Sequence, residues 1–151
     1  MKLKNDKDLS ISTKIAQALH FSDPETGSVV PSIDHSATYS RDENYQPRQA
    51  YWYRRDGNKT TQLAEEIISE LENANASLLF SSGMSACTAV LEMLPAEAHI
   101  TVPRVMYHGV LGQIQNFASK NRIRVDYYEA GDLASMESVI KNGVTQLVWV
   151  E

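Results

Sequence analysis

Cysteine is almost absent from this sequence: Cys87 is the single one among 151 residues. One thiol excludes an internal disulfide, so we expect a reducing compartment, the cytoplasm. Long apolar runs are also lacking, and without about 18 consecutive apolar residues no membrane-spanning helix is expected. The first residues, MKLKNDKDLSISTK, have no apolar segment of the kind that a secretory signal needs.

Positive charge is in short supply, with 14 Lys and Arg against 19 Asp and Glu and a formal net charge of -5. This balance disfavours non-specific binding to nucleic acid. The rest of the composition is ordinary, since 42% of the residues are hydrophobic and 22% are charged, as in globular proteins generally. The length suits one domain with a core of its own.

Periodic patterns are missing from residues 1–60. This stretch carries turn-forming pairs instead: Asp23-Pro24, Thr26-Gly27, Val30-Pro31 and Gln46-Pro47. So long an irregular stretch is unusual inside a compact domain. We therefore expect residues 1–60 to form an arm that packs on another body, such as a second subunit.

From residue 61 the pattern changes. Leu63, Ile67 and Leu71 recur every four residues and predict an amphipathic helix, for which Asn58 or Thr60 is the expected cap. Alternating segments follow: strands at 76–80, 100–102, 122–128 and 145–150, and helices at 84–94, 109–121 and 133–141. Strands that alternate with helices predict an α/β fold with a mainly parallel sheet. Ligands bind such sheets beyond the carboxyl ends of the strands.

Two strand-to-helix turns therefore matter most. The first, FSSGMSA at 80–86, has small residues before a helix start, and the unpaired N–H groups there suit a phosphate. The same composition is typical of any tight turn. The second, VPRVMYHG at 102–109, brings Tyr107 to the mouth of the sheet, where it either packs or stacks on a planar ligand.

Other chemistry-bearing residues form no recognisable site. The four histidines, His20, His35, His99 and His108, show no metal-ligand spacing with each other or with Cys87, so we expect no metal. Cys87 falls on an apolar helix and is expected to be a small core residue. Ser82 lacks the surroundings of a hydrolase nucleophile. Asp126, Glu129 and Asp132 are expected to lie in a solvated loop.

Taken together, several motifs resemble one family. They are the segment YWYRRDGNKTT at 51–61, SGM at 82–84, Tyr107 with Gly109, DPETGSVVPSI at 23–33 and SATY at 36–39. Their order is similar to that in the cysteine/methionine-metabolism enzymes that depend on pyridoxal phosphate (PLP), such as the cystathionine synthases and lyases. The resemblance covers nearly the whole chain. It implies a fold-type-I PLP-dependent transferase, with residues 61–151 as the first part of its large α/β domain.

The resemblance also implies a role for five residues. Tyr53 and Arg55 would hold the cofactor phosphate of a neighbouring subunit in a homo-oligomer, because a guanidinium fork and a phenol both donate to phosphate oxygens. The backbone amides of Gly83 and Met84 would bind the same phosphate within one subunit. Tyr107 would stack on the cofactor ring.

Three residues depart from the family pattern, and one essential residue is missing. Lys59 stands where a proline is usual, Arg104 where an acidic or amide residue is common, and His108 where a glycine is frequent. The Schiff-base lysine of the family is expected beyond Glu151, and Lys14 and Lys59 are poor substitutes for it. We therefore expect an N-terminal fragment with no catalytic residue of its own, inactive alone.

The implied reaction of the complete subunit is elimination or replacement on a sulfur amino acid or an acylated homoserine. The residues leave two other functions open. One is a non-catalytic interaction module that uses the arm to join a relative. The other is a generic α/β domain in which the Ser82-Gly83 turn holds a phosphate ligand such as a nucleotide.

Overall fold

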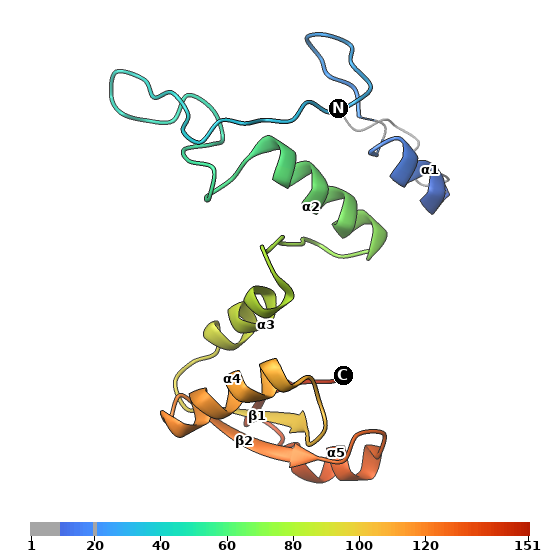
Figure 1. The fold of residues 1–151 in the computed structure, drawn as a ribbon, viewed down its shortest axis with the longest axis vertical. Coiled ribbons are helices and arrows are strands. Elements are labelled where there is room, and N and C mark those ends of the chain that lie inside the picture. Colours follow the sequence, from blue (N-terminus) through green and yellow to red (C-terminus); the bar gives the residue numbers. More distant parts are fainter. Residues whose placement is uncertain (1–9, 20) are drawn as a thin grey trace. The chain divides into compact units, whose positions relative to one another are not determined.

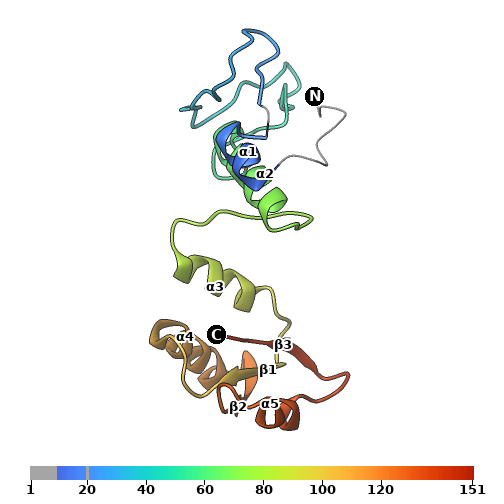
Figure 2. The ribbon, with the colours of Figure 1, turned by 90° about the vertical axis from the view of Figure 1, so that its right-hand side faces the viewer.

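The computed structural model describes residues 10–19 and 21–151, which fall into two compact units (Figures 1 and 2). The first unit ends at Leu79, and the second runs Phe80–Glu151. The functional division expected above, an arm of residues 1–60 followed by a cofactor-binding part at 61–151, stays a prediction. In the described part of the chain, no helix has the length and apolar character to cross a membrane.

The first unit contains two helices, α1 (Ile11–Ala16) and α2 (Lys59–Leu71), joined by turns and irregular chain. The sequence indicated α2 but not α1. Ser10 caps α1 by accepting a hydrogen bond from the Thr13 amide at 3.2 Å. With six residues, α1 is too short to show a helical period, which is why the pattern missed it.

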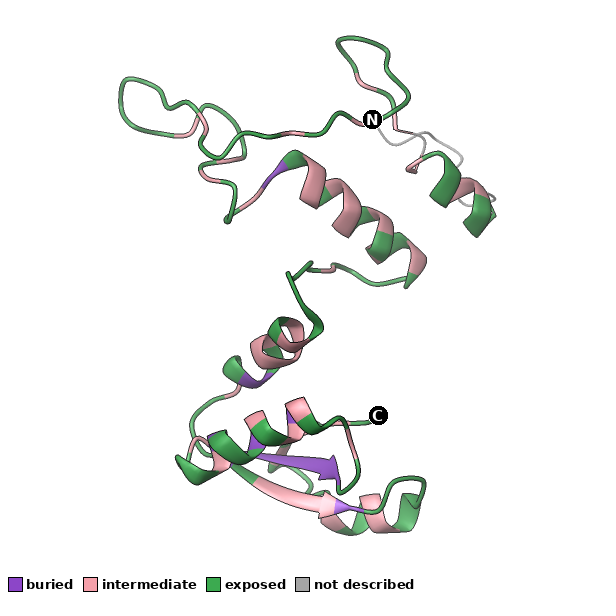
Figure 3. Cartoon of the chain, in the orientation of Figure 1, coloured by how far each residue is buried: buried purple, intermediate pink, exposed green. Residues whose placement is uncertain are grey.

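Asn58 organises the first unit and caps α2. Its side-chain oxygen accepts from the Thr60 amide at 2.9 Å, while its Nδ2 donates to the Asp34 carbonyl and the Tyr39 hydroxyl at 3.2 and 3.1 Å. Among the described residues of this unit, Asn58 is the one that is buried (Figure 3). The buried residue of this unit is thus polar, and each of its side-chain polar atoms is hydrogen-bonded.

The prediction of a strand at 76–80 is wrong. These residues are irregular, and the side chain of Leu78 is 74% exposed. A strand needs a neighbour for its backbone groups. Here α2 supplies the partners instead: Glu65 accepts from the Leu79 amide at 2.9 Å with its carboxylate and from the Ser77 hydroxyl at 2.6 Å with its carbonyl.

The second unit holds a three-stranded parallel sheet in the order β2-β1-β3. Its elements confirm the remaining expectations to within a few residues. They are α3 (Gly83–Glu92), β1 (Ala98–Pro103), α4 (His108–Ser119), β2 (Ile123–Tyr128), α5 (Leu133–Val139) and β3 (Thr145–Val148).

The core of this unit lies between β1 and the helices α3 and α4. Every residue of β1 is buried, because the strand is flanked on both sides and covered on its faces (Figure 3). Ile100 and Val102 face Leu91 of α3 and Ile114 of α4 in one hydrophobic cluster. Apolar burial of this kind is the main force that holds such a unit together.

The chain reverses direction across the sheet at β1. The first crossover, through α4, leads from β1 to β2 on one side, and the next, through α5, leads to β3 on the other side. The loop that leaves the carboxyl end of β1 leads toward β2, while β3 lies on the opposite side of β1. Such a switch point is where open α/β sheets bind ligands.

Candidate functional site

A pocket of about 580 Å³ opens at this switch point, within the second unit. Its volume lies in the range of roughly 300–1,000 Å³ that is usual for cofactor and ligand sites. Three segments build it: the start of α3, the loop into α4, and the chain after β3. The lining residues are Ser82, Gly83, Met84, Cys87, Tyr107, Val110, Trp149, Val150 and Glu151.

The start of α3 offers free backbone donors to this pocket. The Ser82 side chain caps the helix by accepting from the Ser85 amide at 3.1 Å. The amides of Gly83 and Met84 precede the first intrahelical bond and have no hydrogen-bond partner among the described residues. A β-carbon added to Gly83 would meet no atom within 4 Å. The turn is open and suited to an anion.

Tyr107 lies at the other edge of the pocket, directly before α4. Its amide donates to the Glu151 carboxylate at 3.0 Å, which ties the loop after β1 to the chain after β3. Its ring passes so close to Gly109 that an added β-carbon would lie 2.7 Å from the ring. The side chain is 49% exposed, so a face of the ring is accessible to a planar ligand.

Tyr53 and Arg55 come together in the first unit. The Arg55 guanidinium donates to the Tyr53 hydroxyl at 3.0 Å, and its central carbon lies 4.5 Å from the centre of the tyrosine ring. Arg55 has no carboxylate partner among the described residues. Most of its five N–H groups therefore stay available for an anion.

The backbone around this pair is held in place. Tyr53 forms an antiparallel bridge with Thr38, and the Arg54 amide donates to the Ala37 carbonyl at 2.9 Å. The Tyr53 carbonyl then accepts from the amides of Asp56 and Gly57 in a turn. Arg54 is exposed, as Arg55 is, and no hydrogen bond joins its side chain to Tyr53.

The five residues expected in the site thus form two sets, one in each unit. The structure brings Gly83, Met84 and Tyr107 together in one pocket, and it joins Tyr53 to Arg55. The sequence patterns missed Trp149 as a lining residue. Its position just after β3, at the carboxyl end of a strand, was the available signal. Cys87 packs on the core as expected and also lines the pocket.

Of the acidic residues expected in a solvated loop, Glu129 and Asp132 lie in the exposed loop between β2 and α5, as expected, whereas the expectation is wrong for Asp126. Asp126 lies in β2, where its carboxylate contacts Lys141 Nζ at 2.7 Å and His99 Nε2 at 3.0 Å. These contacts, the lysine first, lower the pKa of Asp126. Glu129 pairs with Arg104 at 2.9 Å, and Asp132 caps α5.

Metal-binding groups do not gather in the described part of the chain: no three His, Cys, Asp or Glu side chains there are arranged to hold an ion. His20 lies outside the described residues.

Comparison with known proteins gives one family. Its sequence profile, described as Cys/Met metabolism PLP-dependent enzyme, matches residues 12–151. Mimosinase, chloroplastic, from Leucaena leucocephala is 36% identical over 148 residues. The aligned part is 97% of this chain and 32% of the mimosinase, so the chain spans about a third of the length of that relative.

Solved structures match nearly the whole chain, and the chain again covers about a third of each of them. The crystal structure of metB from Corynebacterium glutamicum matches with a TM-score of 0.85 and 26% identity, covering 97% of this chain and 38% of that one. Cystathionine gamma-lyase from yeast matches with a TM-score of 0.80 and 26% identity, covering 96% and 36%. These similarities confirm the expected fold, part of the α/β domain of a fold-type-I PLP-dependent enzyme.

Proposed function

The chain belongs to the family of Cys/Met metabolism PLP-dependent enzymes, and we propose that it supplies three parts of a transsulfuration enzyme: the phosphate-binding turn, the ring-stacking tyrosine and the arm that serves a neighbouring copy. The reaction of the whole protein is then elimination or replacement at a sulfur amino acid or an acylated homoserine. The yeast cystathionine gamma-lyase, by its name, acts on such a compound.

The pocket of the second unit fits PLP in size and in the type of its groups. A phosphate needs several N–H donors and no nearby carboxylate, and the Gly83–Met84 turn meets the first requirement. A pyridine ring needs a flat apolar face, which Tyr107 and Met84 border. Glu151 is the one carboxylate among the lining residues, and it is occupied by the Tyr107 amide.

Gly83 and Met84 have the task of holding the phosphate. Their amides point from the start of a ten-residue helix, whose dipole adds a favourable potential for an anion. A side chain at position 83 would fill the open space beside these amides, because nothing lies within 4 Å there. Glycine keeps the approach to the backbone free.

Tyr107 covers the ring and excludes water from one of its faces. Its backbone is fixed by the bond to Glu151 and its side chain by the close approach to Gly109. A fixed aromatic needs little reorganisation when a planar ligand arrives. Bound PLP supplies an electron sink for chemistry at the substrate α-carbon, and the residues of this chain bind and orient it.

Tyr53 and Arg55 complete the phosphate site of a second copy. Two observations support this role: the pair is preformed, and the guanidinium keeps donors to spare. The arm also exposes apolar side chains that a partner would cover, with Val29 73% and Val30 71% exposed. The chain then acts in a homo-oligomer in which each copy supplies part of its neighbour's site.

The lysine that bonds to the cofactor is expected to lie outside this chain, since none of the residues that line the pocket of the second unit is a lysine. Lys14 forms an ion pair with Glu70, and Lys59 begins α2; both lie in the first unit, outside the pocket described above. The chain alone is therefore expected to be inactive. A cytoplasmic location stays a prediction from its single cysteine.

The observation that carries this proposal is the convergence of the α3 amides and Tyr107 on one pocket at the switch point. A first experiment titrates the purified chain with PLP and follows absorbance, then adds borohydride and locates any adduct by mass analysis. We expect saturable binding that Tyr107→Ala weakens by about tenfold, the equivalent of one lost stacking contact. An adduct at one particular lysine would contradict the statement that the chain lacks this residue.

A second experiment tests activity. This chain replaces the matching first third of yeast cystathionine gamma-lyase, and cleavage of cystathionine is measured. Arg55→Met is expected to raise the PLP concentration needed for activity about tenfold, since a charged hydrogen bond to phosphate is lost. Arg54→Met, the adjacent and exposed arginine, is the matched control and should change it by less than about twofold.

A generic nucleotide-binding domain would give a different result. It would bind ATP at the Ser82–Gly83 turn, and Tyr53 and Arg55 would be dispensable. Equal loss of function from Arg54→Met and Arg55→Met would likewise argue against the specific phosphate contact.

A further inference from the structure

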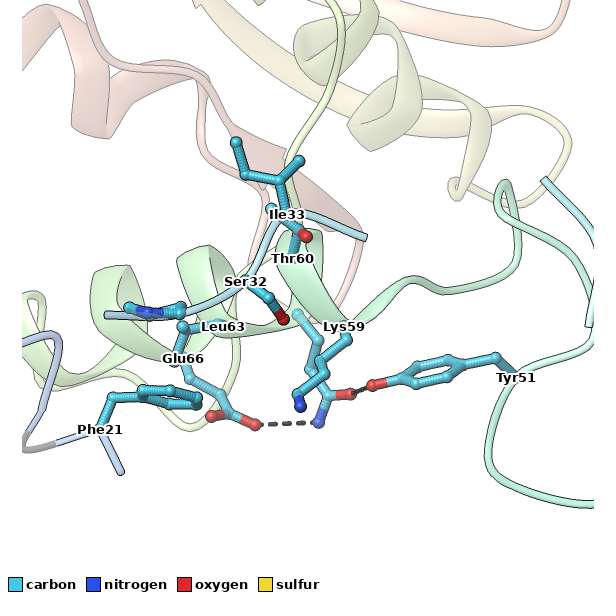
Figure 4. Close-up of a pocket in the computed structure, with 10 residues that line it drawn as sticks. Phe21, Ser32, Ile33, Tyr51, Lys59, Thr60, Leu63 and Glu66 are labelled. Atoms are coloured by element: carbon cyan, nitrogen blue, oxygen red, sulfur yellow. Dashed lines mark hydrogen bonds between the residues drawn. The ribbon is translucent and has the colours of Figure 1, made fainter. Parts of the chain in front are cut away.

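The first unit contains a second pocket, of about 220 Å³, which the proposed cofactor site does not use (Figure 4). It lies between the first two turns of α2 and the segments around Phe21, Ser32 and Tyr51. Its volume is below the roughly 300–1,000 Å³ of sites for drug-sized ligands. A pocket of this volume can therefore hold only a small molecule.

Opposite charges line this pocket without neutralising each other. Lys59 and Glu66 both face it, yet no ion pair within 4.0 Å joins them in the described structure. The carboxylate that Lys59 does approach is Asp23, at 3.5 Å, and the lysine side chain stays 49% exposed. The Lys59 ammonium can thus accept a further anion while Asp23 holds it near the pocket.

The Glu66 carboxylate is held in a fixed orientation. Gln62 Nε2 donates to Glu66 Oε1 at 2.9 Å, and the Tyr51 hydroxyl donates to Gln62 Oε1, which gives the chain of dashed lines in Figure 4. The second oxygen of Glu66 has no partner among the described residues. That oxygen is free to accept a bond from a ligand ammonium group.

Both charges act on the same hydroxyl. Burial raises the pKa of Tyr51, the negative charge of Glu66 raises it further, and the positive charge of Lys59 lowers it. Lys59 and Glu66 thus lie within electrostatic range of one point in the pocket wall. A ligand with a carboxylate and an ammonium a few bonds apart would face both.

Apolar side chains form another part of the wall. Phe21, Pro31 and Leu63 line the pocket together with Ile33, whose side chain is otherwise largely exposed. A short aliphatic group seated here would bury apolar surface at a gain of roughly 25 cal/mol per Å². Filling the pocket with water would leave this apolar surface hydrated, which is less favourable.

We propose that this pocket binds a small apolar α-amino acid in its zwitterionic form, with Lys59 facing the carboxylate, Glu66 facing the ammonium group and the side chain against Phe21 and Leu63. The site is separate from the proposed cofactor pocket, since all its lining residues belong to the first unit. It does not rest on the proposed function. It gives Lys59, at the first position of α2, a ligand-binding role.

The test is calorimetric titration of the purified chain with L-leucine, without PLP. Leucine carries no sulfur, so a substrate effect at the cofactor pocket is avoided. We expect saturable binding, and at least tenfold weaker binding of 4-methylpentanoate and of 3-methylbutylamine, which each lack one of the two charged groups. No saturable binding of leucine, or equal binding of all three compounds, overturns the proposal.

Two variants locate the site. Lys59→Met and Glu66→Gln should each weaken leucine binding about tenfold or more. Lys120→Met and Glu137→Gln, which change the same residue types on exposed positions of the second unit, should leave it within about twofold. Far-UV circular dichroism of every variant shows whether the total helix content is retained. Unchanged binding in both pocket variants overturns the proposal, whereas a PLP titration that fails leaves this result unaffected.

Discussion

His99 and Asp126 form a hydrogen bond across adjacent strands, with His99 Nε2 and Asp126 Oδ2 3.0 Å apart. The Thr145 hydroxyl accepts from the Lys141 amide at 2.8 Å and lies 2.9 Å from His99 Nδ1. With a proton on Nε2 the imidazole donates to Asp126, and Nδ1 and the Thr145 hydroxyl share the second bond. His99, 3% exposed, thus links all three strands of the sheet.

The pKa of Asp126 should respond to Lys141. The lysine hydrogen bond is the largest cause that lowers this pKa, followed by the His99 bond. A carboxyl whose pKa is lowered by folding contributes stability that is present above its ordinary pKa of about 3.9 and is lost as the pH falls through the lowered value.

We therefore expect Lys141→Met to raise the pKa of Asp126 toward its ordinary value, and to reduce the loss of stability below about pH 4. Carbon-13 NMR of the Asp126 carboxyl against pH measures the first effect, and urea unfolding at several pH values measures the second. Lys120→Met, at the C-terminal end of α4, is the control that should change neither. An Asp126 titration that is the same in all three proteins would show that the ion pair is not formed in solution.

Thr101 and Thr145 should respond in opposite ways to the same substitution. The Thr101 hydroxyl is fully buried on β1 and has no hydrogen-bond partner within the described structure. Valine has nearly the same shape without the polar atom, so Thr101→Val should stabilise the protein by about 1 kcal/mol. Thr145→Val removes two formed bonds and should destabilise it by about 2 kcal/mol. Urea unfolding compares the two, and destabilisation by Thr101→Val would mean that its hydroxyl has a partner.

Asn58→Ala should loosen the arm without unfolding the second unit. The substitution removes the α2 cap and the two bonds to Asp34 and Tyr39, a loss of about 2–3 kcal/mol. Hydrogen exchange of the α2 amides should accelerate strongly, while exchange in β1 stays unchanged. Asn44→Ala, in an exposed turn, is the control. Equal acceleration in both units would contradict the division into independent units.

Gly109→Ala should displace the Tyr107 ring while keeping α4. The new methyl group would lie 2.7 Å from the Tyr107 ring, closer than real β-carbon contacts, and 3.1 Å from the Met84 sulfur. The ring therefore has to move. Helix content should hold or rise, since alanine favours helices over glycine by about 1 kcal/mol, but binding of PLP should weaken about tenfold.

Gly112→Ala is the matched control for that change. It lies in the same helix, and an added β-carbon there meets no atom within 4 Å. It should leave PLP binding unchanged. If both variants weaken binding equally, the position of the Tyr107 ring is not what matters.

Local patterns were sufficient for most elements of the second unit. The helices α3 and α4 and the strands β1 and β2 follow from apolar periodicity and from turn residues, which act over a few neighbouring positions. The error at 76–80 came from the same rule, because an apolar run becomes a strand only where another strand lies beside it. No pattern within five residues carries that information.

For the candidate site, too, some features could be predicted from the sequence and others could not. The open turn at Gly83 and the aromatic Tyr107 were visible in the sequence, since a helix start and a strand end have local chemical requirements. Their meeting with Glu151, 44 residues beyond Tyr107, was not. Likewise His99 finds Asp126 and Thr145 at separations of 27 and 46 residues, and Lys59 shares a pocket with Phe21 and Tyr51. The sequence by itself determined which residues are able to bind a phosphate or carry a charge, and the tertiary structure decided which of them meet, because contacts between distant residues depend on how the strands are ordered and the turns directed.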